Sequence, residues 1–434
     1  MRFNTLEGWL EWQEQLHPAE IELGLERAGG VWSNLAGERS KPFTITIAGT
    51  NGKGSTATFL ERILISAGYR VGCYSSPHLI SYNERVRLQA MPVSNEQLCD
   101  AFQEIDCARD VISLSYFEFG TLAALQIFSQ TAVDIQILEV GLGGRLDAVN
   151  IIDADISIIT SIGIDHCDWL GDSREEIGFE KAGIFRPLKA AISGEPDLPD
   201  TVIKKAEEIG ALLKQVGVDF NYSLQESSWN WESKSRQFKT LPLLKLEGEQ
   251  QLRNASVALA AIEALPAYLS VDEEAIRTGL SSARLSGRIQ WLDNEHKILL
   301  DVSHNPESAK VLAQYLQKRK TKGAVFALFS FMADKDIEEI LAVMNPVVDN
   351  WYWIPLVEVA RAADKKQIEM AFSSCKLQQP ESHFSDLAEG LAAARKKAEP
   401  ADCIVVFGSF YLASKLLELV NFTDELSEQA LSQV

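Results

Sequence analysis

The chain has 434 residues, of which 46% are apolar and 24% charged, the proportions of a soluble globular protein large enough for two domains. Its formal net charge of −20 repels nucleic acid, so we expect no DNA or RNA partner, and an anionic ligand needs a local basic site. Short apolar runs, an acidic N-terminus and six cysteines without C-x-x-C spacing argue against a membrane protein, a secreted protein and a zinc site, and predict a cytoplasmic location.

The first strong pattern lies at residues 43–57, FTITIAGTNGKGSTA. The apolar spacing before it, from Leu6 to Leu25, predicts one or two short helices. Phe43–Ala48 is typical of a strand, and a helical pattern follows as far as Ala67. The loop between them consists of Gly49, Thr50, Asn51, Gly52, Lys53, Gly54 and Ser55. Glycines that turn N–H groups inward, a helix N-terminus and a lysine together predict a polyphosphate site, with Lys53 as its cationic clamp.

This loop departs from the general phosphate-loop pattern G-x-x-x-x-G-K-[ST] at two positions. Ile45 stands where glycine is expected, and Gly54 stands where a hydroxyl is expected, with Ser55 one residue late. The alternative is an ordinary strand-to-helix turn with an exposed lysine. The three glycines around Lys53 favour phosphate binding, because they have little other reason to cluster at a helix start.

Polar side chains follow three further predicted strands, which occupy residues 70–75, 133–140 and 155–162. Ser76 lies in a predicted polar loop over residues 75–88, Glu139 lies near the end of its strand, and His166 follows the third strand. If the strands are parallel, these residues share the edge of the sheet where ligands bind in open α/β folds. Ser76 and Glu139 offer the oxygen ligands that Mg²⁺ prefers. His166 is equally compatible with a metal ligand and with a hydrogen-bonded structural histidine, because imidazole better suits transition metals.

The middle of the chain is less regular. Residues 175–186 predict a helix that carries Lys181, which by residue type alone is a solvated surface lysine. Residues 196–246 are more polar and predict antiparallel strands or a surface excursion. Residues 252–265 again predict a helix.

A second α/β series begins after residues 281–288, SSARLSGR, with predicted strands at 297–302, 323–331, 351–356 and 403–407. We therefore place a linker near Ala283–Ser286 and predict domains of residues 1–285 and 286–434. In the second domain Asp301 ends a strand, where a carboxylate accepts from a ribose hydroxyl or serves as a cap. His304 follows it and is compatible with a general base or with a hydrogen-bonding network at a helix start.

Seven ordered motifs span essentially the whole chain. They are Gly49–Ser55, Ser75–Leu79, Glu139–Asp147, Asp165–His166, Glu180–Ile184, Asp301 with His304–Pro306, and Lys335–Asp336. Together they resemble the folylpolyglutamate synthase/dihydrofolate synthase family of the Mur ligase superfamily, whose phosphate loop also has glycine after the lysine. The resemblance implies an α/β fold with a larger N-terminal P-loop ATPase domain and a smaller Rossmann-like C-terminal domain, with catalysis in the cleft between them.

The resemblance also implies roles for individual residues. The ATP phosphates would contact Gly49, Thr50, Asn51, Gly52, Lys53, Gly54 and Ser55, and the rest of the nucleotide would contact Asn254, Arg288 and Asp301. Mg²⁺ would bind Ser76, Glu139 and His166, and a second Mg²⁺ would bind Lys181 as a carbamate, the CO₂ adduct that turns its amine into a carboxylate. The pterin substrate would lie at Phe117, Arg145 and Asp147, and the amino acid near Ser409 and His304. The catalytic set would then be Lys53, Glu139, His166, Lys181 and His304.

The activity implied is that of an ATP-dependent ligase that joins L-glutamate to dihydropteroate and to tetrahydrofolates through an acyl phosphate, acting as a monomer on small molecules. A folylpolyglutamate synthase alone is the nearest alternative, although the wording of 145–148, RLDA, and 76–78, SPH, resembles bifunctional bacterial members. A P-loop kinase or other NTPase would act without glutamate. A muramyl-type ligase needs an N-terminal UDP-binding domain, for which the roughly forty residues before the loop are too few. A non-catalytic binding module leaves the combination of Lys53, Glu139 and His166 unexplained.

Overall fold

The computed structural model describes residues 2–18, 21–35, 41–293, 297–319 and 323–431. The chain divides into two compact units, Met1–Lys245 with Gln250–Arg284, and Leu246–Glu249 with Leu285–Val434. The short segment Leu246–Glu249 groups with the second unit because Glu247 accepts a hydrogen bond from Tyr315 and Glu249 pairs with Lys318. The chain therefore leaves the first unit at Leu246, returns to it at Gln250, and leaves it again at Leu285, so the units are not separated by one boundary in the sequence.

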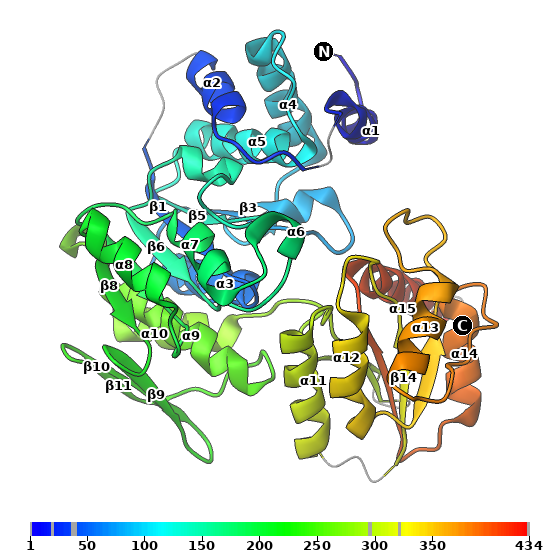
Figure 1. The fold of residues 1–434 in the computed structure, drawn as a ribbon. Helices are drawn as coiled ribbons and strands as arrows, with labels where there is room; N and C mark the ends of the chain where they lie inside the picture. The colour runs from blue at the N-terminus through cyan, green and yellow to red at the C-terminus, as the bar shows by residue number, and fades with distance from the viewer. Residues whose placement is uncertain (1, 19–20, 36–40, 294–296, 320–322, 432–434) are drawn as a thin grey trace. The chain divides into compact units, whose positions relative to one another are not determined.

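An eight-stranded sheet forms the centre of the first unit (Figure 1). In spatial order its strands are β4 (Met91–Pro92), β3 (Val86–Leu88), β2 (Val71–Tyr74), β5 (Ile135–Glu139), β1 (Phe43–Ala48), β6 (Ile156–Ile159), β7 (Ala190–Ser193) and β8 (Leu212–Gln215). Neighbours from β2 to β8 are parallel, and β3 and β4 add an antiparallel edge. Buried parallel strands are apolar on both faces, which is why β1, β5 and β6 were predictable as apolar runs.

Helices cover both faces of this sheet. One face carries α1 (Leu6–Leu16), α2 (Glu26–Asn34), α4 (Asn95–Arg109), α5 (Tyr116–Gln130), α7 (Arg174–Ala182) and α8 (Asp200–Ile209). They share one apolar cluster with Ala48, Leu138 and Ile159, which point to the same face of their strands. On the other face α3 (Lys53–Ser66) packs against α10 (Glu273–Ser282). The shorter elements of this unit are η1 (Tyr82–Arg85), η2 (Ala148–Ile151), α6 (Cys167–Leu170) and η3 (Ala267–Leu269), and α9 (Glu249–Glu263) begins at the division between the units.

Gly279 sets the close contact between α10 and α3. A Cβ at this position would lie 2.4 Å from Ile63 Cα and 2.5 Å from Ile63 N, which are backbone atoms and have no room to move aside. We expect Gly279→Ala to destabilise the first unit by about 2–3 kcal/mol, seen as a lower midpoint of thermal unfolding. Gly30→Ala in α2 is the matched control, because its Cβ would meet only Ile112 Cδ1, at 3.6 Å, and alanine favours the helix. A Gly279→Ala midpoint equal to that of Gly30→Ala would contradict this packing.

A small antiparallel sheet of β9 (Phe220–Leu224), β10 (Trp229–Ser233) and β11 (Gln237–Leu241) follows in the first unit. Trp229 and Trp231 of β10 are buried, and their indole N–H groups donate to Pro242 O (2.9 Å) and Ser256 O (3.1 Å), respectively. The antiparallel strands predicted within residues 196–246 are therefore confirmed. Two further elements of the same region were not predicted: helix α8, and strand β8, which extends the main sheet.

The second unit is built on a five-stranded sheet. In spatial order its strands are β12 (Gln290–Asp293), β13 (Ile298–Leu300), β16 (Cys403–Phe407), β14 (Val325–Phe329) and β15 (Asn350–Trp353), all parallel except β12. Its helices are α11 (Pro306–Arg319), α12 (Ile337–Met344), α13 (Lys365–Ser374), α14 (Leu387–Lys397) and α15 (Phe410–Leu431), with one short turn, η4 (Asn345–Val347). Aromatic rings fill the core, where Phe329 stacks on Phe372 and Trp351 packs edge-on to both.

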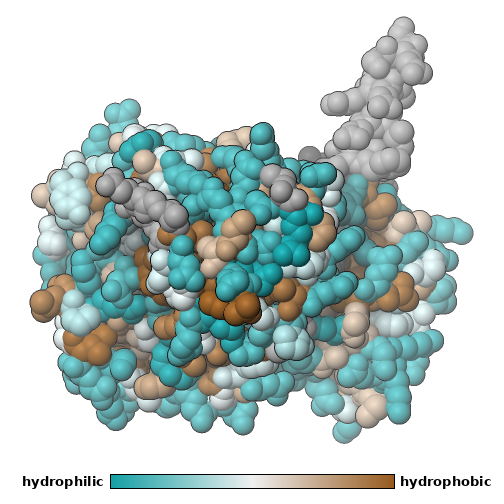
Figure 2. Space-filling model, turned by 90° about the horizontal axis from the view of Figure 1, so that it is seen from above, coloured by the Kyte–Doolittle hydropathy of each residue, from teal (hydrophilic) through white to brown (hydrophobic). Residues whose placement is uncertain are grey.

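The predicted α/β fold class is confirmed, whereas one local prediction was wrong. The second half of the predicted loop over residues 75–88 forms η1 and β3, which pairs with β2. Three residues of strand are too few to give a periodic pattern. Among the described residues, no helix combines the length and apolar character needed to cross a membrane. On the face shown in Figure 2, apolar side chains occur in small groups among hydrophilic ones.

Candidate functional site

The glycine loop after β1 is closely packed against two neighbouring elements. A Cβ at Gly49 would lie 1.9 Å from Thr160 Oγ1, and a Cβ at Gly52 would lie 2.5 Å from Asn254 Oδ1 of α9. Gly52 also has a left-handed φ of 88° as the N-cap of α3. Glycine is therefore required at both positions by space and, at Gly52, by backbone conformation. The same contact places Asn254, a predicted nucleotide contact, beside the loop.

Lys53 is the first residue of α3, and its ammonium group lies over the loop. Nζ donates to Gly49 O (2.9 Å) and to Thr50 O (3.4 Å). Gly54 follows Lys53 in the first turn of the helix, and Ser55 is buried. The helix N-terminus and Lys53 thus supply a partial and a full positive charge at one point, which is the arrangement that binds phosphate.

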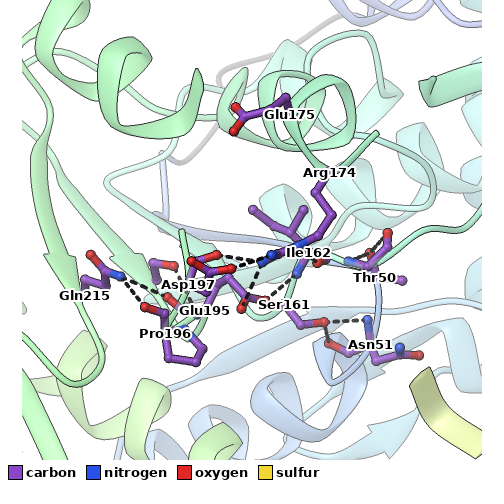
Figure 3. A network of polar contacts seen from close by, with 12 residues as sticks. Thr50, Asn51, Ser161, Ile162, Arg174, Glu175, Glu195, Pro196, Asp197 and Gln215 are labelled. Atoms are coloured by element: carbon purple, nitrogen blue, oxygen red, sulfur yellow. Dashed lines mark hydrogen bonds and ion pairs between the residues drawn. The ribbon is translucent and has the colours of Figure 1, made fainter. Parts of the chain in front are cut away.

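The end of β6 supports the loop from the side (Figure 3). Thr50 N donates to Ser161 O (2.9 Å), and Asn51 N donates to Ser161 Oγ (3.0 Å). Thr160 Oγ1 donates to Asn51 O (2.7 Å). The conformation of Thr50 and Asn51 therefore depends on side chains that lie about a hundred residues later in the sequence.

The strand ends meet at one edge of the sheet, as predicted for parallel strands. Ile47 of β1 is the register partner of Glu139 of β5, and Tyr74 of β2 is the partner of Leu138. Glu139 is only 4% exposed, and Ser76 follows two residues after β2. Carboxyl ends of β1, β2 and β5 thus bring Lys53, Ser76 and Glu139 to the same edge.

Arg87 of β3 holds the segment just before Ser76. Its guanidinium pairs with Glu61 of α3 (3.0 Å) and donates to Ser75 Oγ (2.7 Å). Because α3 also carries the glycine loop, this buried pair ties the loop helix to the Ser75–Ser76 turn. A charged pair between residues so far apart gave no signal in the sequence.

His166 and Lys181 lie in very different surroundings. His166 is exposed and starts α6 with a left-handed φ of 55°. Lys181 is buried, at 3% exposure, near the C-terminal end of α7. Residue type alone predicted a solvated surface lysine, and that prediction was wrong because the turn after β5 covers this end of α7.

The turn after β5 packs directly on α7. A Cβ at Gly144 would lie 2.9 Å from Glu180 O and 3.0 Å from Lys181 O. Arg145 N donates to Glu180 O (2.8 Å), and the Arg145 guanidinium pairs with the Glu180 carboxylate (2.8 Å). Arg145, predicted to contact a pterin, therefore has its guanidinium on α7, where it fixes the position of the helix turn that bears Lys181.

Phe117 and Asp147, the other predicted pterin contacts, meet at Gly141. A Cβ at Gly141 would lie 2.6 Å from ring carbons of Phe117, and Gly141 N donates to Asp147 Oδ2 (3.0 Å). Asp147 also accepts from Leu142 N (2.9 Å) and Val149 N (3.0 Å). Burial raises the pKa of Asp147 to about 6, against the effect of these three hydrogen bonds and of the nearby Lys53 charge.

In the second unit, the predicted site residues gather where β13 and β16 end. Asp301 accepts from Ile289 N (2.8 Å) and Ser303 N (2.9 Å), and burial raises its pKa above the ordinary value despite the neighbouring Arg288 charge. The Arg288 guanidinium lies over the Phe410 ring, 5.4 Å from its centroid. Asp301 and Arg288 are therefore brought together on one side of the sheet.

His304 and Ser409 lie at the same strand ends. His304 Nδ1 lies 2.8 Å from Val302 O, a contact that places the proton on Nδ1 and the lone pair on Nε2 when the ring is neutral. The His304 ring is 5.8 Å from that of Phe410. Ser409 is buried and its Oγ accepts from Leu412 N (3.1 Å), so it caps α15.

These surroundings fit a polyphosphate and a hard divalent cation. The loop has a lysine at a helix N-terminus and two glycines at positions with no room for a Cβ. Ser76 and Glu139 add oxygen ligands at the same edge of the sheet. In the described part of the chain, no three His, Cys, Asp or Glu side chains gather closely enough for a metal site. Mg²⁺ usually binds only one or two protein carboxylates and completes its shell with water and phosphate oxygens, so a single carboxylate such as that of Glu139 is compatible with it.

Two family models match the chain. Residues 115–262 match the Mur ligase middle domain, and residues 287–410 match the Mur ligase, glutamate ligase domain. The dihydrofolate synthase/folylpolyglutamate synthase of Escherichia coli K12 is 44% identical over 418 residues, which cover 96% of this chain and 96% of that protein.

Solved structures agree over almost the whole length. Escherichia coli FolC in complex with DHPP and ADP has a TM-score of 0.90 at 44% identity, covering 97% of this chain and 99% of that chain. A bifunctional folylpolyglutamate synthase/dihydrofolate synthase with Mn, AMPPNP and L-glutamate bound has a TM-score of 0.88 at 42% identity, covering 97% and 99%. The chain is therefore a ligase that belongs to the dihydrofolate synthase/folylpolyglutamate synthase family, built from Mur ligase domains.

Proposed function

We propose that this ligase joins L-glutamate to dihydropteroate, forming dihydrofolate, and to tetrahydrofolates, forming polyglutamates. The glycine loop carries the proposal: it places Lys53 at a helix N-terminus, next to the strand end that bears Glu139. Relatives that are similar to this chain over nearly their full length are named for both activities. One solved structure contains DHPP and ADP, and another contains Mn, AMPPNP and L-glutamate.

The reaction has two steps. An oxygen of the acceptor carboxylate attacks the γ-phosphorus of ATP, the bond from that phosphorus to the β,γ-bridging oxygen breaks, and ADP leaves with an acyl phosphate formed. The glutamate amine then attacks the acyl carbon, phosphate leaves with the former carboxylate oxygen, and the amine loses a proton. Lys53 neutralises charge on the phosphoryl oxygens while the phosphoryl group is transferred. Such preorganised electrostatic stabilisation is usually the largest single contribution to catalysis.

Ser76, Glu139 and His166 would hold Mg²⁺ at the strand ends, and Lys181, carrying CO₂ as a carbamate, would hold a second Mg²⁺. When bound, such ions supply positive charge that offsets the developing charge on phosphate oxygens. Carbamate formation is balanced: the neutral lysine amine adds to CO₂ and loses one proton. The burial of Lys181 and the tight packing of Gly144 on its helix turn would keep that group in one place.

The remaining contacts that we propose involve residues of both units. Asn254 beside the loop, and Arg288 with Asp301 in the second unit, would contact the nucleotide. Phe117 would present its ring to the pterin, with Asp147 and Arg145 fixing the turn after β5 against it. His304, with its Nε2 lone pair, and Ser409 would contact glutamate. We expect the enzyme to act as a monomer.

Phosphate release from ATP tests the proposal when it is measured with dihydropteroate or tetrahydrofolate, each with and without L-glutamate. We expect glutamate-dependent release with both acceptors. Release with tetrahydrofolate alone would restrict the enzyme to polyglutamate synthesis. Release that ignores glutamate would instead indicate a P-loop kinase or NTPase and would contradict the ligase.

A further inference from the structure

An ion pair between Arg174 and Glu195 binds both backbone polar groups of Ile162, which follows β6 (Figure 3). Glu195 Oε2 accepts from Ile162 N (2.9 Å), and Arg174 Nε donates to Ile162 O (3.0 Å). The two side chains are joined to each other, Arg174 Nη2 to Glu195 Oε1 at 3.2 Å. The backbone N–H and C=O of Ile162 are therefore both bonded to the same ion pair.

The residues on either side of Ile162 bind the glycine loop. Gly163 N donates to Thr50 Oγ1 (3.0 Å), and Thr50 Oγ1 donates in turn to Gly163 O (3.0 Å). On the other side, Ser161 accepts from the backbone N–H groups of Thr50 and Asn51. A shift of the backbone at Ile162 would thus move both Ser161 and Gly163, which support the Thr50–Asn51 backbone.

The pair joins three separate elements of the first unit. Glu195 follows β7 after Gly194, whose Cβ would lie 2.7 Å from Thr160 O, so β7 and β6 are in close contact at this end. Arg174 is the first residue of α7, the helix that bears Lys181. Gln215 Nε2, from β8, donates to Glu195 O (3.3 Å) and Pro196 O (2.9 Å), which holds the carboxylate segment in place.

We propose that Glu195 and Arg174 are positioning residues for the nucleotide: through the backbone of Ile162 they hold Thr50 and Asn51 in the phosphate-binding conformation. This inference rests on the proposed function, in which the loop binds ATP. The contacts that carry this effect are those of the pair with Ile162, so the pair acts on the loop through residues 161–163. Loss of the pair misplaces the loop backbone without removing any group that contacts phosphate.

The outer side of Arg174 provides a matched control. Arg174 Nη1 also pairs with Asp197 Oδ2 (2.7 Å), but the Asp197 side chain is 89% exposed, whereas that of Glu195 is 9% exposed. Asp197→Asn removes an ion pair from the same guanidinium and leaves the two hydrogen bonds to Ile162 N and O in place. Exposed ion pairs contribute little, so this variant isolates the inner contact.

The test is the dissociation constant of a fluorescent ADP analogue, measured on the full-length protein with Mg²⁺ below its unfolding temperature. We expect Glu195→Gln and Arg174→Gln each to weaken binding about 10- to 100-fold, because small misplacements of a binding group have effects of that size. The double variant should be no weaker than the weaker single variant, since the two residues act as a unit. Asp197→Asn should stay within about twofold of the wild type.

Steady-state kinetics separates positioning from general damage to the fold. We expect the KM for ATP to rise while the KM for L-glutamate stays unchanged. Arg174→Lys keeps the charge but loses the planar fork that reaches Ile162 O, so it should fold and still weaken ADP binding, even if Glu195→Gln does not fold. Folded variants that bind ADP as tightly as the wild type, or an equal loss in Asp197→Asn, would overturn the inference. A wild type that binds no ADP would instead refute the proposed function.

Discussion

Replacing Lys53 by alanine is expected to lower the turnover number by about 10²–10³-fold, the usual cost of removing one group that stabilises charge in the transition state. Lys53 Nζ donates hydrogen bonds to two loop carbonyls, Gly49 O and Thr50 O. Its loss should therefore leave the sheet and the apolar cluster unchanged. The measurement is glutamate-dependent phosphate release, with circular dichroism and the thermal midpoint as checks on the fold.

Lys234→Ala is the control for this variant. Lys234 is 77% exposed and pairs with Asp219 away from the loop, so its loss should change turnover by less than about twofold. A folded Lys53→Ala enzyme with near-normal turnover would contradict the role of the loop in phosphoryl transfer.

Replacing Lys181 by alanine is expected to reduce turnover by about 10²-fold or more, because a carboxylate ligand of the second metal would be lost. Small acids such as formate or acetate should restore part of the activity by occupying the place of the carbamate. Growth of the wild-type protein with ¹³C-enriched bicarbonate should give a carbamate carbon signal in NMR spectra that is missing from Lys181→Ala.

Lys189→Ala serves as the comparison for Lys181. Lys189 pairs with Asp155 at a half-exposed position, and its loss should neither reduce turnover nor remove the carbon signal. Unchanged activity in Lys181→Ala, or a loss that no small acid restores, would argue against a carbamate ligand.

The sequence predicted the parts of the fold that are dictated locally. The strand–loop–helix at 43–67 and the strand at 403–407 appear where apolar runs meet glycine, and the structure places them there as β1 with α3 and as β16. Parallel strands make such runs continuous, so their ends, and the residues Ser76 and Glu139 just at them, were also predictable.

Contacts between distant segments were not predictable in this way. Glu195 follows a strand as Glu139 ends one, but β7 (Ala190–Ser193) has the sequence AAIS, with two alanines and a serine, and is too weakly apolar to form a recognisable run. Its partner Arg174 was unremarkable as the first residue of a helix. The burial of Lys181 likewise depends on the turn at Gly144, which lies in a different motif.

The roles of individual side chains also depend on contacts that the sequence does not show. Arg145 was assigned to the pterin from its motif, whereas its guanidinium lies on Glu180. Asp147 accepts hydrogen bonds from three backbone N–H groups, a bonding pattern that only the folded turn reveals. The sequence indicated what these residue types can do chemically. It did not indicate which residues they bind in the folded protein.

The transfer of one oxygen atom tests the central claim most directly. Dihydropteroate labelled with ¹⁸O in its carboxylate is incubated with ATP, Mg²⁺, L-glutamate and the enzyme, and the released phosphate is analysed by mass spectrometry. We predict one ¹⁸O atom in each phosphate, because the acceptor oxygen that attacks the γ-phosphorus leaves with it when glutamate displaces phosphate. Phosphate that carries no label, with dihydrofolate formed, would contradict activation of the carboxylate by ATP.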